Sequence, residues 1–136
     1  MLIGALVNLG AVVDLLAEES GSVHLLCAGT EGRITLEDVL CAGGIAHWLN
    51  LAVDDADPGD DSTQLALGLF ASCGHNYDRA YEDRVLAILR QSRGGRSLID
   101  CGLAADIAVC AEQDKFDIVP ELSRDPWEIR AARKKK

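Results

Sequence analysis

The residue types that phosphate chemistry needs gather in one short segment, residues 29–38 (GTEGRITLED). Arg33 can donate two parallel hydrogen bonds to a phosphate or a sulfonate. A helix that begins near Thr35 adds backbone N–H groups and the positive end of its dipole, which favour an anion. The segment also carries three carboxylates, whose hard oxygens suit Mg²⁺: Glu31, Glu37 and Asp38. Such a metal would clamp phosphoryl oxygens and activate a water, so the segment is a candidate anion site.

A structural role explains part of the same pattern. Thr35, followed three residues later by Asp38, is close to a capping box. Acidic residues in a first helical turn are stabilised by the helix dipole without any catalytic duty. Glu31 and Arg33 could equally form a surface ion pair, which contributes little stability. Residue spacing alone therefore leaves both the capping and the chemical interpretation open.

A second candidate anion site is the glycine-rich segment 92–96 (SRGGR). Its glycines let backbone amides converge, and Arg93 and Arg96 flank them. The alternative is a plain turn between two helices. Composition alone leaves both interpretations open here as well.

Several other chemistries are excluded by the residues that would have to perform them. The five cysteines and three histidines contain no CxxC pair and no ligand spacing, which excludes a zinc site and a Cys-His nucleophile. We expect the cysteines to be buried, reduced thiols. Residues 54–61 (DDADPGDD) lack the glycine and glutamate positions of a calcium loop, so we interpret them as a linker.

The charge is unevenly distributed along the chain. Residues 130–136 (RAARKKK) hold five of the 13 basic residues, which leaves residues 1–129 with 8 basic against 22 acidic groups, a net charge of −14. This acidic body offers no cationic face to a nucleic acid. The longest apolar run, residues 1–7, is far shorter than the roughly 18 to 20 residues that span a membrane. We therefore expect a cytoplasmic protein that binds neither nucleic acids nor membranes.

The hydrophobic pattern predicts the elements that position these segments. Residues 1–7 (MLIGALV) and 23–28 (VHLLCA) are apolar runs of strand length, and helical spacing begins between them at Asn8. Together they predict a parallel βαβ unit. Several helices follow before a last short strand at residues 116–119. The predicted fold class is α/β. It comprises a parallel βαβ unit, several helices and a last short strand, and it forms part of a larger mixed α/β fold.

The order of these elements indicates where a ligand would bind. In α/β sheets, ligands bind beyond the carboxyl ends of the strands. Asn8 directly follows the first predicted strand, and residues 29–38 directly follow the second. We therefore expect Asn8 and the second loop to face the same ligand.

Three segments carry a resemblance to a known family. They are LIGALVNLGAV, the loop CAGTEGRITLEDVLCAGG, and the stretch SRGGRSLIDCGLAADIAVCAEQD that runs on to FDIVP. In this order and at these spacings they resemble the second half of the 2-phosphosulfolactate phosphatase family, over residues 1–120. The matching motif positions are Asn8, Gly29, Glu31, Gly32, Arg33, Glu37, Asp38, Gly95 and Asp106.

The resemblance implies a phosphatase, a phosphoric monoester hydrolase. Its reaction would be the magnesium-dependent hydrolysis of 2-phospho-3-sulfolactate to 3-sulfolactate and phosphate, a step of coenzyme M biosynthesis in organisms that make that coenzyme. An acidic protein needs arginines and a divalent cation to bind so anionic a small phosphoester. We assign catalysis to Glu31, Arg33 and Asp38, and the Mg²⁺ ion to Glu37 and Asp38. The candidate substrate-binding residues are Asn8, Gly29, Thr30, Gly32, Arg93 and Arg96.

The resemblance also implies a missing half. Family members carry an N-terminal half with an aspartate-arginine-threonine strand end and a TTNGT loop, and neither motif occurs in this chain. We interpret residues 1–129 as one α/β domain that resembles the C-terminal half, and residues 130–136 as a basic disordered tail. The chain would then be a truncated phosphatase or a derivative that has lost the chemistry.

The expected partner follows from the first predicted strand. This strand has no upstream neighbour in the chain, so its sheet edge would be exposed and would favour pairing with another chain. The expected partner is an N-terminal half-domain or, in a homo-oligomer, a second copy. The alternative function is a non-catalytic α/β interaction module derived from the same family.

Overall fold

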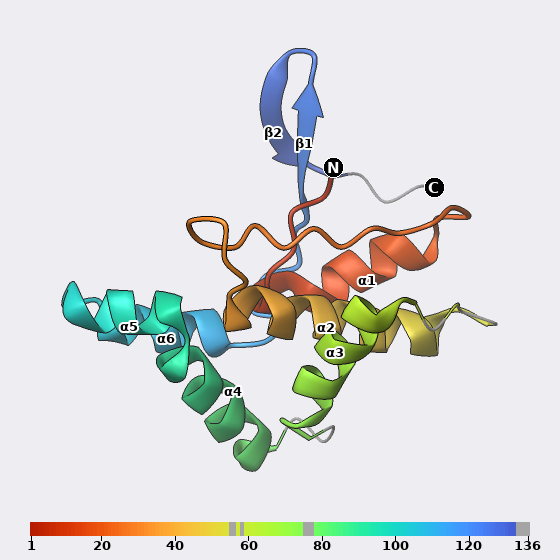
Figure 1. Ribbon diagram of the computed structural model, residues 1–136. Helices are drawn as coiled ribbons and strands as arrows, with labels where there is room; N and C mark the ends of the chain where they lie inside the picture. Colours follow the sequence, from red (N-terminus) through yellow and green to blue (C-terminus); the bar gives the residue numbers. More distant parts are fainter. Residues whose placement is uncertain (55–56, 58, 75–77, 133–136) are drawn as a thin grey trace.

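The chain folds into six α-helices and one antiparallel β-hairpin in a computed structural model that describes residues 1–54, 57, 59–74 and 78–132 (Figure 1). A short 3₁₀ turn, Leu6–Asn8, precedes the first helix. The helices are α1 (Leu9–Ala17), α2 (Leu36–Ala52), α3 (Asp61–Ala71), α4 (Arg79–Gln91), α5 (Arg93–Asp100) and α6 (Ala104–Ala111). The strands are β1 (Pro120–Arg124) and β2 (Trp127–Ala131). Within these residues, no helix is both long and apolar enough to cross a membrane.

The helices pack against one another and not against a sheet, and five of them share one core. Each contributes a side chain that is at most 2% exposed: Leu9, Leu40, Phe70, Val85 and Ile107. α2 and α3 approach each other closely, since a Cβ added to Gly43 would lie 2.1 Å from the backbone oxygen of Ala66. The core is mainly aliphatic, and the layers that enclose it are helical.

The predicted parallel βαβ unit is not formed. Its helix is confirmed as α1, but residues 22–28 run back along α1 and α2 as an open segment without strand pairing (Figure 1). Residues 1–7 pair only briefly with β1, where Ile3 N donates to Pro120 O at 2.8 Å and Leu2 bridges to Glu121 in antiparallel orientation. An apolar run becomes a strand only where a neighbour supplies backbone partners. The prediction assumed that residues 1–7 and 23–28 would partner each other, and they do not.

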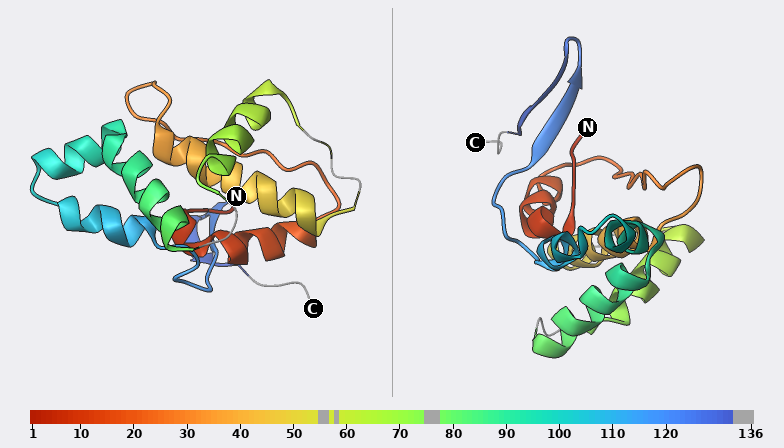
Figure 2. Two further views of the ribbon diagram at one scale, coloured as in Figure 1. Left: turned by 90° about the horizontal axis from the view of Figure 1, so that it is seen from below. Right: turned by 90° about the vertical axis from the view of Figure 1, so that its left-hand side faces the viewer.

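The C-terminal strand lies later than predicted. Residues 116–119 form no strand, and β1 begins at Pro120, which the prediction took as the end of the strand. Proline is accepted as the first residue of a strand because only its N–H is missing. β1 pairs with β2 from Pro120↔Ala131 to Arg124↔Trp127, and this hairpin stands away from the helices (Figure 2). β2 extends to residue 131, within the predicted tail, whereas residues 133–136 lie outside the described residues.

Candidate functional site

A tight hairpin turn lies at the centre of the segment 29–38. Thr30 N donates to Arg33 O at 3.0 Å, and Arg33 N donates to Thr30 O at 3.1 Å. The two residues between them, Glu31 and Gly32, have φ angles of 53° and 70°, as in a type I′ turn. Gly29 also has a positive φ of 65°, and a Cβ there would lie only 2.4 Å from Arg33 O. The turn therefore needs glycine at position 29 and presents the Glu31 carboxylate from a left-handed backbone.

Asp38 ties this turn to the N-terminus of α2. Its Oδ2 accepts hydrogen bonds from Gly29 N at 2.6 Å and from Thr35 Oγ1 at 2.7 Å. Thr35 is the N-cap residue of α2 and is 3% exposed. Its hydroxyl donates to the Asp38 side chain and accepts from no backbone N–H among the described residues, so the capping box that the spacing suggested is not formed. Asp38 is thus a positioning residue that holds the loop over the helix end.

The segment 92–96 meets the segment 29–38 at the same place. Ser92 is buried and caps α5, its Oγ accepting from Gly95 N at 2.9 Å. Arg93 Nη2 forms an ion pair with Glu31 Oε2, across 62 residues of sequence. The loop before α2 accordingly lies beside α5 (Figure 2). The two candidate segments of the sequence therefore meet at one junction, which is built from a hairpin turn and two helix N-termini.

Glu37 lies at the centre of this junction. It belongs to the first turn of α2, and its carboxylate packs against Gly94 in the first turn of α5. A Cβ added to Gly94 would lie 2.4 Å from Glu37 Oε1. Glu37 Oε2 is buried and has no hydrogen-bond partner among the residues that the structure describes. A buried carboxylate oxygen without a donor is costly, so this atom has an unused capacity to bind a cation or a donor.

A magnesium ion held at this site would draw most of its ligands from waters and from a bound phosphate. In proteins Mg²⁺ commonly takes one or two carboxylates and fills its other positions with waters and substrate phosphate oxygens. Glu37 Oε2 is suited to one such position. Asp38 is less available, because its Oδ2 already accepts two hydrogen bonds. Across the described ranges, no group of three His, Cys, Asp or Glu side chains is placed to hold a metal without further ligands.

The three candidate arginines differ in what they already bind. Arg93 is held by Glu31, and Arg96 Nη1 donates to Gln91 O at the end of α4. Arg33 is exposed, and its side chain makes no hydrogen bond or ion pair within the described part of the chain. Arg33 is therefore free to reach an anion, whereas Arg93 is fixed beside the turn.

Asn8 has a structural role that the sequence did not predict. It is 6% exposed, and its Oδ1 accepts from Ala5 N at 2.8 Å. Its Nδ2 donates to Ile3 O at 3.2 Å and to Ile118 O at 2.9 Å. The Asn8 amide thus joins the first residues of the chain to the segment before β1. Among the residues that the structure describes, no hydrogen bond joins Asn8 to the turn, and its role in substrate binding stays a prediction.

Two thiols beside Asp38 were not singled out from the sequence. Cys27 and Cys41 line one cavity together with Asp38. Burial raises the pKa of Cys41 to about 12, with further contributions from Cys27 and Asp38, and burial followed by the Asp38 charge raises the pKa of Cys27. Both therefore stay protonated at neutral pH and are poor nucleophiles. The sequence signal for the position of Cys41 was its spacing: it follows Asp38 by three residues, which places both on the same face of α2.

The expectation that the cysteines are buried holds for part of the set. Cys73 is buried and Cys41 is half-buried. Three cysteines are exposed: Cys27, Cys101 and Cys110. Small and apolar sequence neighbours did not bury these thiols, because the surrounding segments lie at the surface.

We expect Gly29→Ala to lower the free energy of unfolding by more than Gly32→Ala does. Both changes place a Cβ on a backbone with positive φ, which costs about 1–2 kcal/mol. Only at Gly29 would the Cβ also meet Arg33 O, at 2.4 Å, whereas nothing lies within 4 Å at Gly32. We expect an additional loss of at least about 1 kcal/mol for Gly29→Ala, measured by urea unfolding. Equal losses in the two variants would contradict the close approach of Gly29 to the turn.

Comparison with known proteins covers most of the chain. The family model of 2-phosphosulpholactate phosphatase matches residues 1–125, which include both candidate segments. A probable 2-phosphosulfolactate phosphatase of Synechococcus sp. (strain JA-2-3B'a(2-13)) is 40% identical over 119 residues, which are 85% of this chain and 45% of that protein. The protein of the same name from Caldanaerobacter subterraneus subsp. tengcongensis is 31% identical over 122 residues, 90% of this chain and 46% of its own length. The chain thus spans about half the length of the curated relatives that it matches.

Proposed function

Because the chain belongs to the 2-phosphosulfolactate phosphatase family, we propose that it is the part of a phosphatase that holds a small anionic phosphoester. The match over residues 1–125 confirms the family resemblance of the three sequence segments. The proposed reaction is the magnesium-dependent hydrolysis of 2-phospho-3-sulfolactate to 3-sulfolactate and phosphate, a reaction that serves coenzyme M biosynthesis where that coenzyme is made. The observation that carries the proposal is the junction of residues 29–38 and 92–96 at two helix N-termini.

Substrate binding is assigned to the exposed side of this junction. The Arg33 guanidinium makes no hydrogen bond or ion pair with the described residues, which suits bidentate binding of a phosphate or a sulfonate. The N-terminal amides of α2 and α5 add positive dipole ends beside it. Gly29, Thr30 and Gly32 form the turn that keeps Arg33 there. In this proposal Arg93 supports the site by holding Glu31, and Arg96 adds positive charge at the next turn of α5.

The metal is assigned to Glu37, whose buried Oε2 lacks a partner among the described residues. When bound, Mg²⁺ polarises the phosphoryl group and lowers the pKa of an attacking water. Asp38 keeps the loop in place through Gly29 N and Thr35 Oγ1, and its remaining oxygen is the second candidate for the metal. A chain with a net charge of −9 needs such a cation to accept a substrate that carries phosphate, sulfonate and carboxylate.

We assign to Glu31 the role of accepting the proton of the attacking water. Its Oε2 is engaged by Arg93, which fixes the carboxylate, and its side chain is 72% exposed, so that Oε1 can face a bound phosphoester. In hydrolysis the water oxygen bonds to phosphorus, the ester P–O bond breaks, and the leaving alkoxide takes a proton. Glu31 would take the proton of the water and return one to the alkoxide.

The proposal includes a second half-domain and a cytoplasmic location. The relatives that match this chain are about twice as long as the matched region, which is 45% of the Synechococcus protein. We expect activity only when this chain is joined by the remaining, N-terminal half, in the same polypeptide or as a separate chain. All five cysteines are free, which supports a reducing compartment.

Phosphate release is the direct test. The chain is mixed with the half of the Synechococcus protein that lies outside the match, and 2-phospho-3-sulfolactate is added with Mg²⁺ or with a chelator. We expect release only from the mixture and only with Mg²⁺, and slower release from 2-phospholactate, which lacks the sulfonate. A mixture that forms a complex and releases no phosphate would overturn the phosphatase proposal and favour the non-catalytic interaction module.

A further inference from the structure

The segment that leads into the candidate site has an unusual surface. Residues 22–28 carry the sequence SVHLLCA, yet Leu25 is 36% exposed and Leu26 is 83% exposed. Their backbone N–H and C=O groups form no hydrogen bond with any residue that the structure describes. Apolar side chains and unpaired backbone groups together are the features of a sheet edge that lacks its neighbour.

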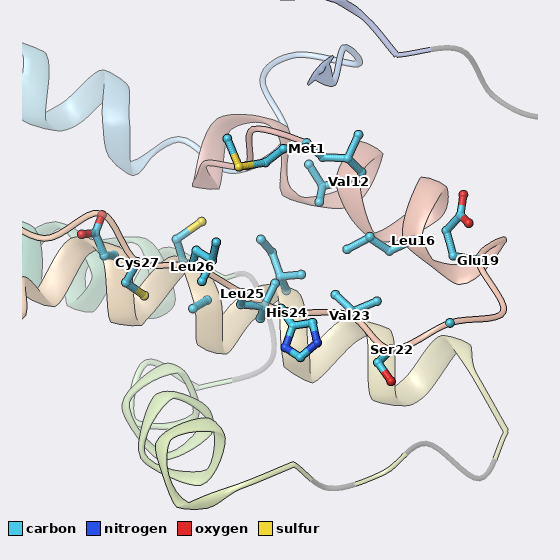
Figure 3. A pocket seen from close by; sticks show the side chains of 17 residues that line it. Met1, Val12, Leu16, Glu19, Ser22, Val23, His24, Leu25, Leu26 and Cys27 are labelled. Atoms are coloured by element: carbon cyan, nitrogen blue, oxygen red, sulfur yellow. The ribbon is translucent and has the colours of Figure 1, made fainter. Parts of the chain in front are cut away.

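A cavity of about 400 Å³ lies between this segment and the first residues of the chain. Figure 3 shows Val12 and Leu16, from α1, facing the segment that carries Val23 and Leu25. Ile45, from α2, also lines the cavity. The cavity therefore offers an apolar wall next to the backbone groups of the open segment, which is what an added strand with one apolar face requires.

We propose that residues 22–28 and this cavity form the docking slot for a β-strand of the other half of the protein. That half corresponds to the part of the longer relatives that lies outside the match with this chain. The inference rests on the proposed function, which makes that half the partner of this chain. Two further observations identify this occupant. The relatives contain more than half of their length outside the match, and residues 22–28 lie inside the family match over residues 1–125.

The position of the slot gives it a consequence for the site. Residue 28 is followed directly by Gly29, whose N–H is bound by Asp38. A strand that fixes residues 22–28 therefore also fixes one end of the turn that carries Glu31 and Arg33. A second copy of this chain is a weaker occupant, since each copy carries a net charge of −9 and the two would repel.

The slot is tested by binding, without substrate or Mg²⁺. The separately produced half of the Synechococcus protein is titrated with this chain and with two variants, Leu26→Asp and Leu65→Asp. Leu65, on α3, is 75% exposed and serves as the matched control for Leu26 at 83%. Because both side chains face solvent, neither change removes a core contact. We expect binding by the parent chain and by Leu65→Asp, and affinity at least about tenfold weaker for Leu26→Asp.

Hydrogen exchange of the backbone amides in the same complex gives the second readout. We expect protection of residues 23–28 when the other half is bound, because a neighbouring strand supplies their hydrogen-bond partners. Binding that leaves these amides unprotected, or that is the same for Leu26→Asp, would overturn the slot. Self-association of the chain through Leu26, in place of binding to the other half, would also overturn it. Docking without phosphate release would instead overturn the phosphatase proposal alone.

Discussion

Glu37→Gln is expected to abolish the response of the protein to Mg²⁺. In the parent chain, Mg²⁺ with phosphate should raise the melting temperature by several degrees, and in the variant it should not. Phosphate release by the assembled phosphatase should fall at least about a hundredfold, since a metal contact is worth several kcal/mol and each ~1.36 kcal/mol is a factor of ten. The reason is that Glu37 Oε2 is a buried carboxylate oxygen without a partner among the described residues.

The stability of the same variant separates a functional role from a structural one. Without metal, Glu37→Gln should not lower the free energy of unfolding, because a neutral amide costs less to bury than an unpaired carboxylate oxygen. Glu18→Gln is the matched control, since Glu18 is exposed at the end of α1 and should change neither quantity. Destabilisation of Glu37→Gln with an unchanged Mg²⁺ response would show that Glu37 is only a structural carboxylate.

Gly94→Ala is expected to cause a similar loss of activity, although it adds and removes no charged group. A Cβ at this position would lie 2.4 Å from Glu37 Oε1, which is the end of a flexible side chain. The carboxylate should therefore move while the backbone stays in place. Because alanine is favoured over glycine in a helix by up to about 1 kcal/mol, the free energy of unfolding should stay the same or rise. Phosphate release and the Mg²⁺ response should fall to the level of Glu37→Gln.

Gly68→Ala provides the control for this substitution. Gly68 lies in α3, and a Cβ there would have nothing within 4 Å. This variant should gain stability and keep full activity. Combining Gly94→Ala with Glu37→Gln should cause no further loss, since both changes act on one carboxylate. Full activity in Gly94→Ala would contradict the contact between the two helix N-termini.

The helices could be predicted from the sequence because their signals are local. Asp60 and Asp78 precede apolar periodic runs, and each accepts a hydrogen bond at 2.9 Å from the backbone N–H three residues later. The strands could not be predicted in the same way. Residues 23–28 have strand composition, but a strand requires a partner, and within the described residues this chain supplies none. The antiparallel hairpin was missed because the prediction took Pro120 as the end of a strand, whereas β1 begins there.

Residue types and spacing single out the segments 29–38 and 92–96, but they do not indicate that the two segments meet. The structure brings them together, and the chemistry assigned to them stays a prediction. Their junction depends on where the fold places the N-termini of α2 and α5, which no local pattern encodes, so the pairing of Glu31 with Arg93 was not foreseen. Two neighbouring acidic residues of the first segment differ in role. Asp38 holds the loop through two hydrogen bonds, whereas Glu37 Oε2 has no partner among the described residues.

We propose that the turn at residues 29–33 and the two helix N-termini form one magnesium-dependent phosphatase site when the other half is present. The decisive measurement is the rate of phosphate release from 2-phospho-3-sulfolactate by the complex of this chain with that half. We predict release that requires both halves and Mg²⁺ and that is lost in Glu37→Gln. A stable complex that releases no phosphate, or that releases it equally well with Glu37→Gln, would show that the junction is not this site.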